Sequence, residues 1–300
     1  MTAARPKGCN IMRITGNSAV TFALLFSAVS ANAQETLKPF KDRLFAYPQT
    51  LEERDGGAYL KVDYRELRDI NERDAVPERR AKRQYIDLAG RRATKPAQLE
   101  TPTGALNYQF AGKTSNARFI TIYIHGKGGN AKQGVNDHSF GGNFNRIKML
   151  MLKNNGLYLS PDAGDFTTSD IAKIETLIGQ AAANSPSAKI VLACGSAGGA
   201  VCYALADQNN IAQRLSGIAL LGSFWNDALF ASAAGKRKVP LYIAHGSHDT
   251  VFDIQQVESF YTRARSNGLP VRMVRFETGT HGTPIRMIDW RAAFNWMLSQ

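Results

Sequence analysis

The sequence predicts an α/β protein with a mostly parallel β-sheet and helices on both faces. Two observations support this class. From about residue 104 onward, short apolar segments alternate with longer segments of helical periodicity, which is typical of parallel strands joined by helices. In addition, Ser196 stands in a run of small residues that joins the apolar segment 190–193 directly to a helical one. Such a turn presents a serine hydroxyl above the edge of a sheet.

The first 33 residues predict a secretory signal peptide. The apolar segment 19–29 is too short to cross a bilayer as a helix. Ala31-Asn32-Ala33 then supplies small residues at the positions that a signal peptidase requires, so Gln34 is the expected mature N-terminus. The basic residues before the apolar segment are Arg5, Lys7 and Arg13. We therefore expect a periplasmic or secreted protein without a transmembrane segment after cleavage.

Residues 34–103 differ in composition from the rest of the chain, because they are rich in charged residues and poor in long apolar runs. Alternation predicts strands over 59–64 and 84–88, with a short helix over 65–72 between them. We interpret the segment as an N-terminal extension that packs on the core and keeps its charges in solvent. The alternative is that it borders the active site and contributes to the choice of substrate.

Residues 104–300 form the predicted catalytic domain. Its strands are expected at 106–110, 118–125, 157–160, 190–193, 216–221, 239–244 and 271–276. Its main helices are expected at 144–154, 171–183, 254–266 and 284–297, with a further helix starting at 200. Parallel strands end at one edge of a sheet, and functional side chains collect at that edge.

Three side chains that follow predicted strands suit nucleophilic catalysis. A serine needs a base to accept its proton, and the base needs an acid to orient it. Ser196 follows the strand 190–193, Asp249 follows 239–244, and His281 follows 271–276. This order predicts Ser196 as nucleophile, His281 as base and Asp249 as orienting acid, with Asp253 as the rival acid. The other histidines are expected to have structural or solvent-exposed roles; they are His125, His138, His245 and His248.

These motifs resemble the α/β-hydrolase fold, which the order Ser, Asp, His and a serine elbow characterise. His245-Gly-Ser-His-Asp249-Thr-Val251 is similar to the H-G-x-x-D-x-V segment of carboxylesterase-like and dienelactone-hydrolase-like members. The resemblance covers about residues 104–300. Cys194 departs from the usual G-x-S-x-G elbow, where a glycine is expected. The backbone N–H of Ala197 is one expected oxyanion donor, and the resemblance implies that the other is the N–H of Lys127 in the Gly-rich loop after His125.

The resemblance also calls attention to a short connection. Members of this fold often carry a lid or cap after the strand that ends here near Leu221, but only residues 222–238 are available. This length allows one short helix near 228–234 and no large cap domain, so we expect an open pocket. The aromatic residues of the connection could line an acyl pocket or pack in the core; they are Phe224, Trp225 and Phe230.

Composition limits the partners. The formal net charge is +12, which we interpret mainly as a solvated basic surface, with contact with anionic surfaces as the alternative. Basic residues show no aromatic interleaving, so no nucleic-acid partner is expected. Cys194 and Cys202 are expected as two buried thiols, with a disulfide as the alternative, and no cysteine spacing predicts a metal site. No metal or organic cofactor is implied.

The sequence therefore predicts an exported serine hydrolase that cleaves a small-molecule or lipid carboxylic ester through an acyl-enzyme. A lipase or phospholipase, a thioesterase and a peptidase of the same fold are the catalytic alternatives. A non-catalytic binding protein with a hydrolase-like fold is the alternative from another class.

Overall fold

The computed structural model describes residues 1–4 and 36–300. The predicted cleavage site after Ala33, and nearly all of the predicted signal peptide, lie outside the described residues. The chain divides into the units 1–33 and 34–300, and the second unit contains every helix and strand described below. No helix among the described residues combines the length and the apolar character that crossing a bilayer requires.

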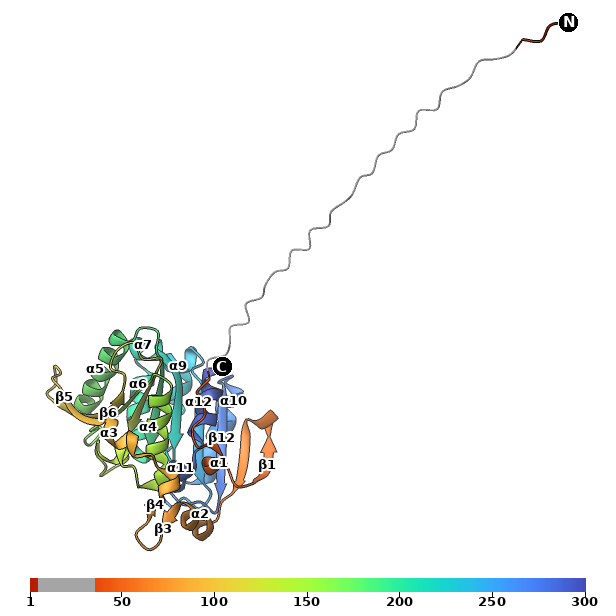
Figure 1. Ribbon diagram of the computed structural model, residues 1–300. Helices are drawn as coiled ribbons and strands as arrows, with labels where there is room; N and C mark the ends of the chain where they lie inside the picture. Colours follow the sequence, from red (N-terminus) through yellow and green to blue (C-terminus); the bar gives the residue numbers. More distant parts are fainter. Residues whose placement is uncertain (5–35) are drawn as a thin grey trace. The chain divides into compact units, whose positions relative to one another are not determined.

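A ten-stranded sheet runs through the second unit, with the strand order β1-β2-β12-β11-β10-β9-β7-β8-β6-β5 (Figure 1). The seven strands from β2 to β8 in this order pair in parallel, and antiparallel pairs are confined to the two ends. The strands are β1 Thr50–Arg54, β2 Tyr59–Asp63, β5 Thr94–Leu99, β6 Leu106–Gly112, β7 Phe119–Ile124, β8 Leu157–Pro161, β9 Lys189–Gly195, β10 Leu215–Leu221, β11 Leu241–Gly246 and β12 Val271–Glu277.

Helices cover both faces of this sheet, as the sequence predicts. One apolar core contains Ile120 and Leu192 from the strands together with side chains of α5, α6 and α10. The opposite core contains Tyr123 and Val191 together with side chains of α4 and α12. The helices are α1 Asp42–Phe45, α2 Glu66–Arg73, α3 Leu88–Ala93, α4 Asn143–Lys153, α5 Thr168–Asn184, α6 Gly199–Ala206, α7 Asn209–Ala212, α8 Ala228–Ala231, α9 Ala233–Lys236, α10 Ile254–Ser266, α11 Thr283–Met287 and α12 Trp290–Leu298.

The N-terminal segment contributes strands to both ends of the sheet. β2 pairs in parallel with the last strand, β12, and β1 adds an antiparallel edge beside it. β5 pairs with β6 at the other end. A small separate hairpin, β3 Asp74–Ala75 and β4 Arg80–Ala81, follows α2. The segment 36–103 is thus an integral part of the sheet's edges.

The predicted strand 84–88 is wrong. Arg83–Tyr85 forms a single 3-10 turn, and α3 begins at Leu88. The reason lies at Asp87, whose side chain accepts a hydrogen bond from the N–H of Ala89 and so caps the helix. An aspartate in this position favours a helix start over a continuing strand.

The predicted closing helix over 284–297 is divided in two. α11 ends at Met287, and α12 begins at Trp290 after Asp289. The Oδ1 atom of Asp289 accepts hydrogen bonds from the N–H groups of Arg291 and Ala292. It also lies 3.1 Å from Nη2 of Arg146, whose side chain is fully buried. Asp289 therefore both caps α12 and neutralises a buried guanidinium.

We predict that Asp289→Ala lowers the free energy of unfolding by about 2–3 kcal/mol, because it removes a cap and one carboxylate partner of a buried charge. Asp253→Ala is the matched control, since Asp253 caps α10 in the same manner through Gln255 and Gln256 and should cost only about 1 kcal/mol. Urea denaturation of both variants measures the difference. Equal losses would mean that the Arg146 contact contributes nothing.

Candidate active site

Ser196 occupies a sharp turn between the central strand β9 and helix α6. Its φ is 52°, a left-handed conformation that is uncommon for residues other than glycine. The turn packs closely against the end of β7. A Cβ atom on Gly198 would lie 2.4 Å from the carbonyl oxygen of His125, and one on Gly126 would lie 2.9 Å from Cβ of Ser196. Only glycine fits at these two positions, so they fix the approach of the Gly-rich loop to the serine.

The structure brings Ser196, His281 and Asp249 together in one hydrogen-bonded chain. Nε2 of His281 lies 2.8 Å from Oγ of Ser196, and Nδ1 of His281 lies 2.8 Å from Oδ2 of Asp249. The three residues follow β9, β12 and β11, whose carboxyl ends share one edge of the sheet. The rival acid, Asp253, caps α10 instead.

The hydrogen bonds of His281 determine its tautomer. An ionised carboxylate only accepts hydrogen bonds, so Nδ1 carries the proton that faces Asp249. Nε2 of the neutral ring is then an acceptor for the hydroxyl of Ser196. The turn that carries His281 is closed by two bonds between Thr280 and Thr283, one from each backbone N–H. The ring is therefore oriented from both sides.

Asp249 is held by donors from three directions. Its Oδ1 accepts from the N–H groups of Val251 and Phe252 at 2.8 and 3.1 Å, and Oδ2 faces His281. Burial by itself would raise the pKa of Asp249, but the hydrogen bonds from His281, Val251 and Phe252 outweigh it and the pKa is lowered. The carboxylate is therefore ionised at neutral pH, which the predicted role of an orienting acid requires.

His245 supplies a further contact to the same carboxylate. Its Nε2 lies 2.9 Å from the carbonyl oxygen of Phe252 and 3.3 Å from Oδ2 of Asp249. Because a carbonyl oxygen only accepts, Nε2 carries a proton that both oxygens share. The side chain is fully buried, and burial lowers its pKa. The sequence predicts a structural or solvent-exposed role for His245, but not this additional donor to Asp249.

His125 organises the Gly-rich loop. Its Nε2 accepts a hydrogen bond from the N–H of Ala163, so the proton is on Nδ1, which donates to the carbonyl oxygen of Gly126 at 2.8 Å. The N–H of Gly129 donates to the same oxygen. The C=O of Gly126 and the N–H of Lys127 belong to one trans peptide and point in opposite directions. Because the C=O faces His125 and Gly129, the N–H of Lys127 points away from these two residues. The Lys127 side chain itself is exposed.

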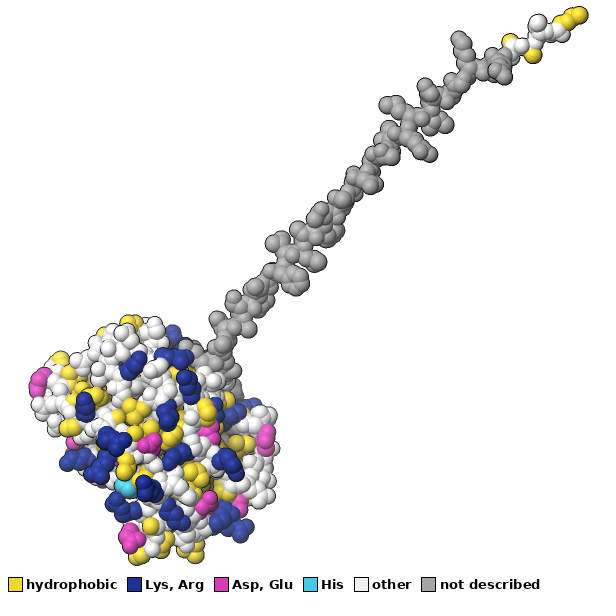
Figure 2. Space-filling model, in the orientation of Figure 1, with side chains coloured by type: hydrophobic (Ala, Val, Ile, Leu, Met, Phe, Trp, Pro, Cys, Tyr) yellow, Lys and Arg dark blue, Asp and Glu magenta, His cyan; other side chains and the backbone are white. Residues whose placement is uncertain are grey.

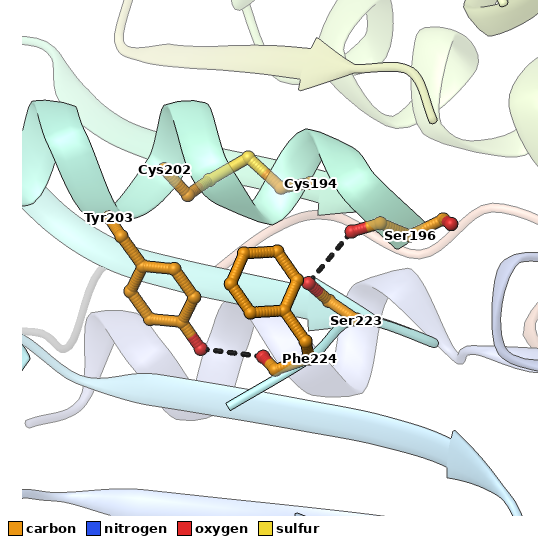
Figure 3. The surroundings of a disulfide bond; sticks show 6 residues. All are labelled: Cys194, Ser196, Cys202, Tyr203, Ser223 and Phe224. Carbon is orange, nitrogen blue, oxygen red and sulfur yellow. Dashed lines mark hydrogen bonds between the residues drawn. A yellow bond between two sulfur atoms is a disulfide. The ribbon is translucent and has the colours of Figure 1, made fainter. Parts of the chain in front are cut away.

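The expectation of two free thiols is wrong, because Cys194 and Cys202 form a disulfide (Figure 3). α6 begins at Gly199, directly after the elbow, so Cys202 lies in the first turn of the helix, beside the end of β9. The Cα–Cα distance is 6.3 Å, within the range that a disulfide spans. Figure 3 shows the hydroxyl of Ser196 pointing away from the disulfide.

Ser223 is a second support of the elbow that the sequence does not predict. Its Oγ donates a hydrogen bond of 2.8 Å to the carbonyl oxygen of Ser196, which Figure 3 draws as a dashed line. A Cβ atom on Gly199 would collide with this hydroxyl at 2.0 Å. A serine after a strand is common, and only the three-dimensional neighbourhood of β9 and β10 distinguishes this one.

The structure divides the aromatic residues proposed for an acyl pocket. The ring of Phe224 lies 5.7 Å from that of Phe252, which in turn lies 5.7 Å from the ring of His281. Phe224 therefore belongs to an aromatic row that leads to the triad. Phe230 stacks instead on Phe260 of α10 at 5.3 Å, and Trp225 packs against the same apolar core. Only Phe224 is brought near the site by these contacts.

The short connection between β10 and β11 contains only the four-residue helices α8 and α9. This agrees with the expectation that no large cap domain is inserted there. His248 is exposed and bonds through its backbone to Gly279, whereas His138 is half-buried rather than fully exposed. Neither imidazole takes part in the chain of Ser196, His281 and Asp249.

Comparison with known proteins identifies the fold. No family model matches the chain, and no curated protein matches its sequence. A thermostable esterase superposes with a TM-score of 0.55 at 13% identity, covering 70% of this chain and 63% of that one. An α/β serine hydrolase homologue from Coxiella burnetii superposes with a TM-score of 0.50 at 16% identity, covering 67% of this chain and 95% of that one.

A third solved structure gives the same result. A putative α/β hydrolase from Agrobacterium tumefaciens superposes with a TM-score of 0.53 at 12% identity, covering 68% of this chain and 95% of that one. At such identities the likeness concerns the fold alone. Together with the mostly parallel sheet and its helices, these matches confirm that the protein has the α/β-hydrolase fold.

We predict that replacing both cysteines (Cys194→Ala with Cys202→Ala) lowers the free energy of unfolding by about 2–3 kcal/mol, the chain-entropy value for so short a loop. Denaturation of the oxidised wild type, the reduced wild type and the double variant measures this loss. Reduction should destabilise the wild type and leave the variant unchanged. If reduction shifts both proteins equally, the disulfide does not stabilise the fold.

We predict that His245 makes the protein less stable as the pH falls. Because burial lowers its pKa, the unfolded chain takes up a proton from about pH 7 downward while the folded chain does not. The loss is at most about 1.4 kcal/mol per pH unit for one such group. His245→Asn should therefore flatten the dependence of unfolding free energy on pH, measured between pH 7.5 and 5.

His248→Asn is the matched control, since this neighbouring histidine is exposed. The control should retain the wild-type slope. A His245→Asn variant with the same slope as the wild type would contradict the assignment of a buried neutral imidazole.

Proposed function

We propose that this protein is an exported serine hydrolase that cleaves carboxylic esters, with Ser196 as nucleophile, His281 as general base and Asp249 as orienting acid. The observation that carries the proposal is the continuous chain of two 2.8 Å hydrogen bonds that links the three side chains. The position of Ser196 on a strained turn between strand and helix adds support, since this conformation exposes a nucleophile.

The reaction proceeds in two halves. Oγ of Ser196 attacks the ester carbonyl carbon while Nε2 of His281 takes its proton, and Asp249 stabilises the imidazolium that results. The tetrahedral intermediate then releases the alcohol, which receives that proton from Nε2. Water attacks the acyl-enzyme with His281 again as the base, and the acid leaves as Ser196 regains its proton.

Two backbone N–H groups are proposed to stabilise the developing oxyanion. Ala197 stands in the first turn after β9, where helical N–H groups have no acceptor within the helix. The Lys127 N–H is turned by the bonds that His125 and Gly129 make to the preceding carbonyl. Each such donor contributes roughly 3 kcal/mol to transition-state stabilisation. His125 is a positioning residue for the Lys127 donor, because it holds the carbonyl group that precedes this N–H.

Export is supported by two independent features. The N-terminal sequence has the organisation of a cleavable signal, and the disulfide Cys194–Cys202 suits an oxidising compartment. We propose a periplasmic or secreted location with cleavage after Ala33. Residues 34–103 then begin the mature protein, ahead of the catalytic domain 104–300.

The substrate class is proposed as a small-molecule or lipid carboxylic ester. The absence of a cap between β10 and β11 leaves the triad beside an open surface with Phe224 and Phe252 at hand for an apolar acyl group. Thioesters and peptides require the same nucleophile, so a panel of acyl chains and leaving groups distinguishes these substrates. No metal or organic cofactor enters any step.

We predict that Ser196→Ala lowers kcat/KM for p-nitrophenyl esters by at least about a thousandfold, since the acyl-enzyme can no longer form. Ser259→Ala is the control, because Ser259 is an exposed residue of α10 and should retain full activity. A fluorophosphonate probe should label the wild type and the control, and leave the Ser196→Ala variant unlabelled.

The same measurement tests the non-catalytic alternative. A wild-type protein that neither hydrolyses esters nor reacts with the probe would have a hydrolase-like fold without an activated serine. Ester turnover that survives in Ser196→Ala would contradict the assignment of the nucleophile.

A further inference from the structure

A basic hollow of about 870 Å³ lies in the N-terminal part of the fold, away from the three residues of the triad. Five basic side chains and two carboxylates line it. Its basic members include Lys41, Arg80, Arg83 and Arg91, and it extends to Leu88 and His138. A cluster of positive charge attracts anions when its members have no carboxylate partners within the protein. We therefore consider the ion pairs and hydrogen bonds of each basic side chain in turn.

The guanidinium groups of Arg80, Arg83 and Arg91 are exposed and make no ion pair or hydrogen bond with residues 1–4 or 36–300. Elsewhere in the same part of the chain, arginines do find partners, as Arg68 does in Asp63 and Asp69. Of the two carboxylates, Asp87 is engaged as the cap of α3. The hollow therefore has a surplus of positive charge that the fold does not use.

Lys41 adds a cation at the inner side of this hollow. Its Nζ donates to the carbonyl oxygens of Gln84 and Ile86 at 2.6 and 2.8 Å. An ammonium group has three donors, so one remains for a ligand. Burial lowers the pKa of Lys41, with Asp87 acting in the opposite direction. An anion placed here would stabilise a charge that the protein itself leaves poorly compensated.

The positive charge extends beyond a single hollow. A second depression of about 400 Å³ shares Arg80, Arg91 and His138 with the first. Because the same two arginines line both depressions, the surface can bind several anionic groups side by side rather than one small anion. Figure 2 shows Lys and Arg side chains gathered around one histidine over the part of the face that carries α3 and the β3–β4 hairpin in Figure 1.

Apolar side chains project among these charges. Leu88 lines the hollow and is 49% exposed, and Val76, next to the lining residue Ala75, is 59% exposed. Single exposed apolar side chains are common on folded surfaces, so the relevant observation is that these two lie beside unpaired guanidinium groups. Basic and apolar groups side by side are the pattern of peripheral membrane surfaces, where cations meet phosphates and apolar groups enter the acyl boundary.

This surface adjoins the loop that packs beside the triad. The carbonyl oxygen of His138 accepts the N–H of Ala81 from the hairpin. Two residues later, Phe140 lies against Gly282, where a Cβ atom would be 3.5 Å from its ring. Gly282 follows His281 directly. One loop therefore borders the basic hollow on one side and the proposed catalytic histidine on the other.

We propose that Lys41, Arg80, Arg83 and Arg91, with Leu88 and Val76 at the rim, form a surface that docks this protein onto an anionic phospholipid membrane. The headgroup phosphates enter the two depressions, and the two apolar side chains reach the acyl boundary. This inference goes beyond the proposed hydrolase function and does not depend on it.

The test uses the triple variant Arg80→Gln, Arg83→Gln and Arg91→Gln of the mature protein. Each basic residue near an anionic membrane contributes about 1 kcal/mol, so the affinity for vesicles of phosphatidylcholine with phosphatidylglycerol should fall by about a hundredfold. Vesicles of phosphatidylcholine alone should bind weakly. Added salt should weaken the binding of the wild type, because exposed charges are screened.

A matched control makes the same change in net charge at the amino-terminal ends of the parallel strands. Lys189, Arg214 and Lys236 are exposed and stand at or before the starts of β9, β10 and β11. Their triple glutamine variant should bind anionic vesicles within about a factor of three of the wild type. In addition, Leu88→Asn should weaken vesicle binding while the folded state, checked by thermal unfolding, is retained.

Several outcomes would overturn the proposal. These are equal vesicle binding by the two triple variants, no preference for anionic lipid, or no binding at all. Inorganic phosphate is tested separately. If phosphate raises the melting temperature of the wild type but not of the triple arginine variant, and vesicles do not bind, the hollow is a site for a soluble anion. Hydrolysis of a soluble p-nitrophenyl ester by the triple variant, measured in parallel, separates a failure of docking from a failure of the hydrolase assignment.

Discussion

The left-handed backbone of Ser196 is the constraint on which the rest of the structure depends. A residue with a side chain occupies this conformation at a cost of about 1–3 kcal/mol, and the surroundings must enforce it. Here the disulfide from Cys194 to Cys202 ties the strand before the turn to the helix after it. The hydroxyl of Ser223 holds the carbonyl of Ser196 itself, and Gly198 allows the turn to press against β7.

Asp249 is also held by its surroundings, in this case by hydrogen-bond donors. Asp249 is buried, and a buried carboxylate without donors would be protonated. Backbone N–H groups of its own loop, together with His281 and His245, compensate the burial. The consequence for His281 is a single tautomer with Nε2 directed at Ser196. The proposed nucleophile, base and acid are therefore each fixed by neighbours outside the three residues themselves.

Much of this arrangement follows from the sequence, because local patterns determine it. The strand-to-helix turn at Ser196 and the positions of Asp249 and His281 after strands are encoded by short segments of small, apolar and polar residues. The sequence leaves thiols and a disulfide as alternatives at Cys194 and Cys202, since the choice depends on how tightly α6 folds back on β9. Asp289 shows the same limit: the break between α11 and α12 is a local capping event, but its partner Arg146 is distant in the chain.

The N-terminal segment is where sequence and structure differ most, and the reason is physical. Its strands are short and highly charged, so periodicity alone indicates little about their partners. In the fold, β2 pairs with β12 at one end of the sheet and β5 pairs with β6 at the other. The chain leaves β2 at the carboxyl end of β12 and enters β5 level with the amino end of β8, so it crosses from one end of the parallel strands to the other. α2, the β3–β4 hairpin and α3 belong to this crossing, and so do the unpaired arginines Arg80, Arg83 and Arg91. The crossing is also held by contacts of its own, because Ala81, Tyr85 and Ile86 belong to a small buried apolar cluster and the N–H of Ala81 donates to the carbonyl oxygen of His138. Its charged side chains therefore project from a backbone that the fold holds in place.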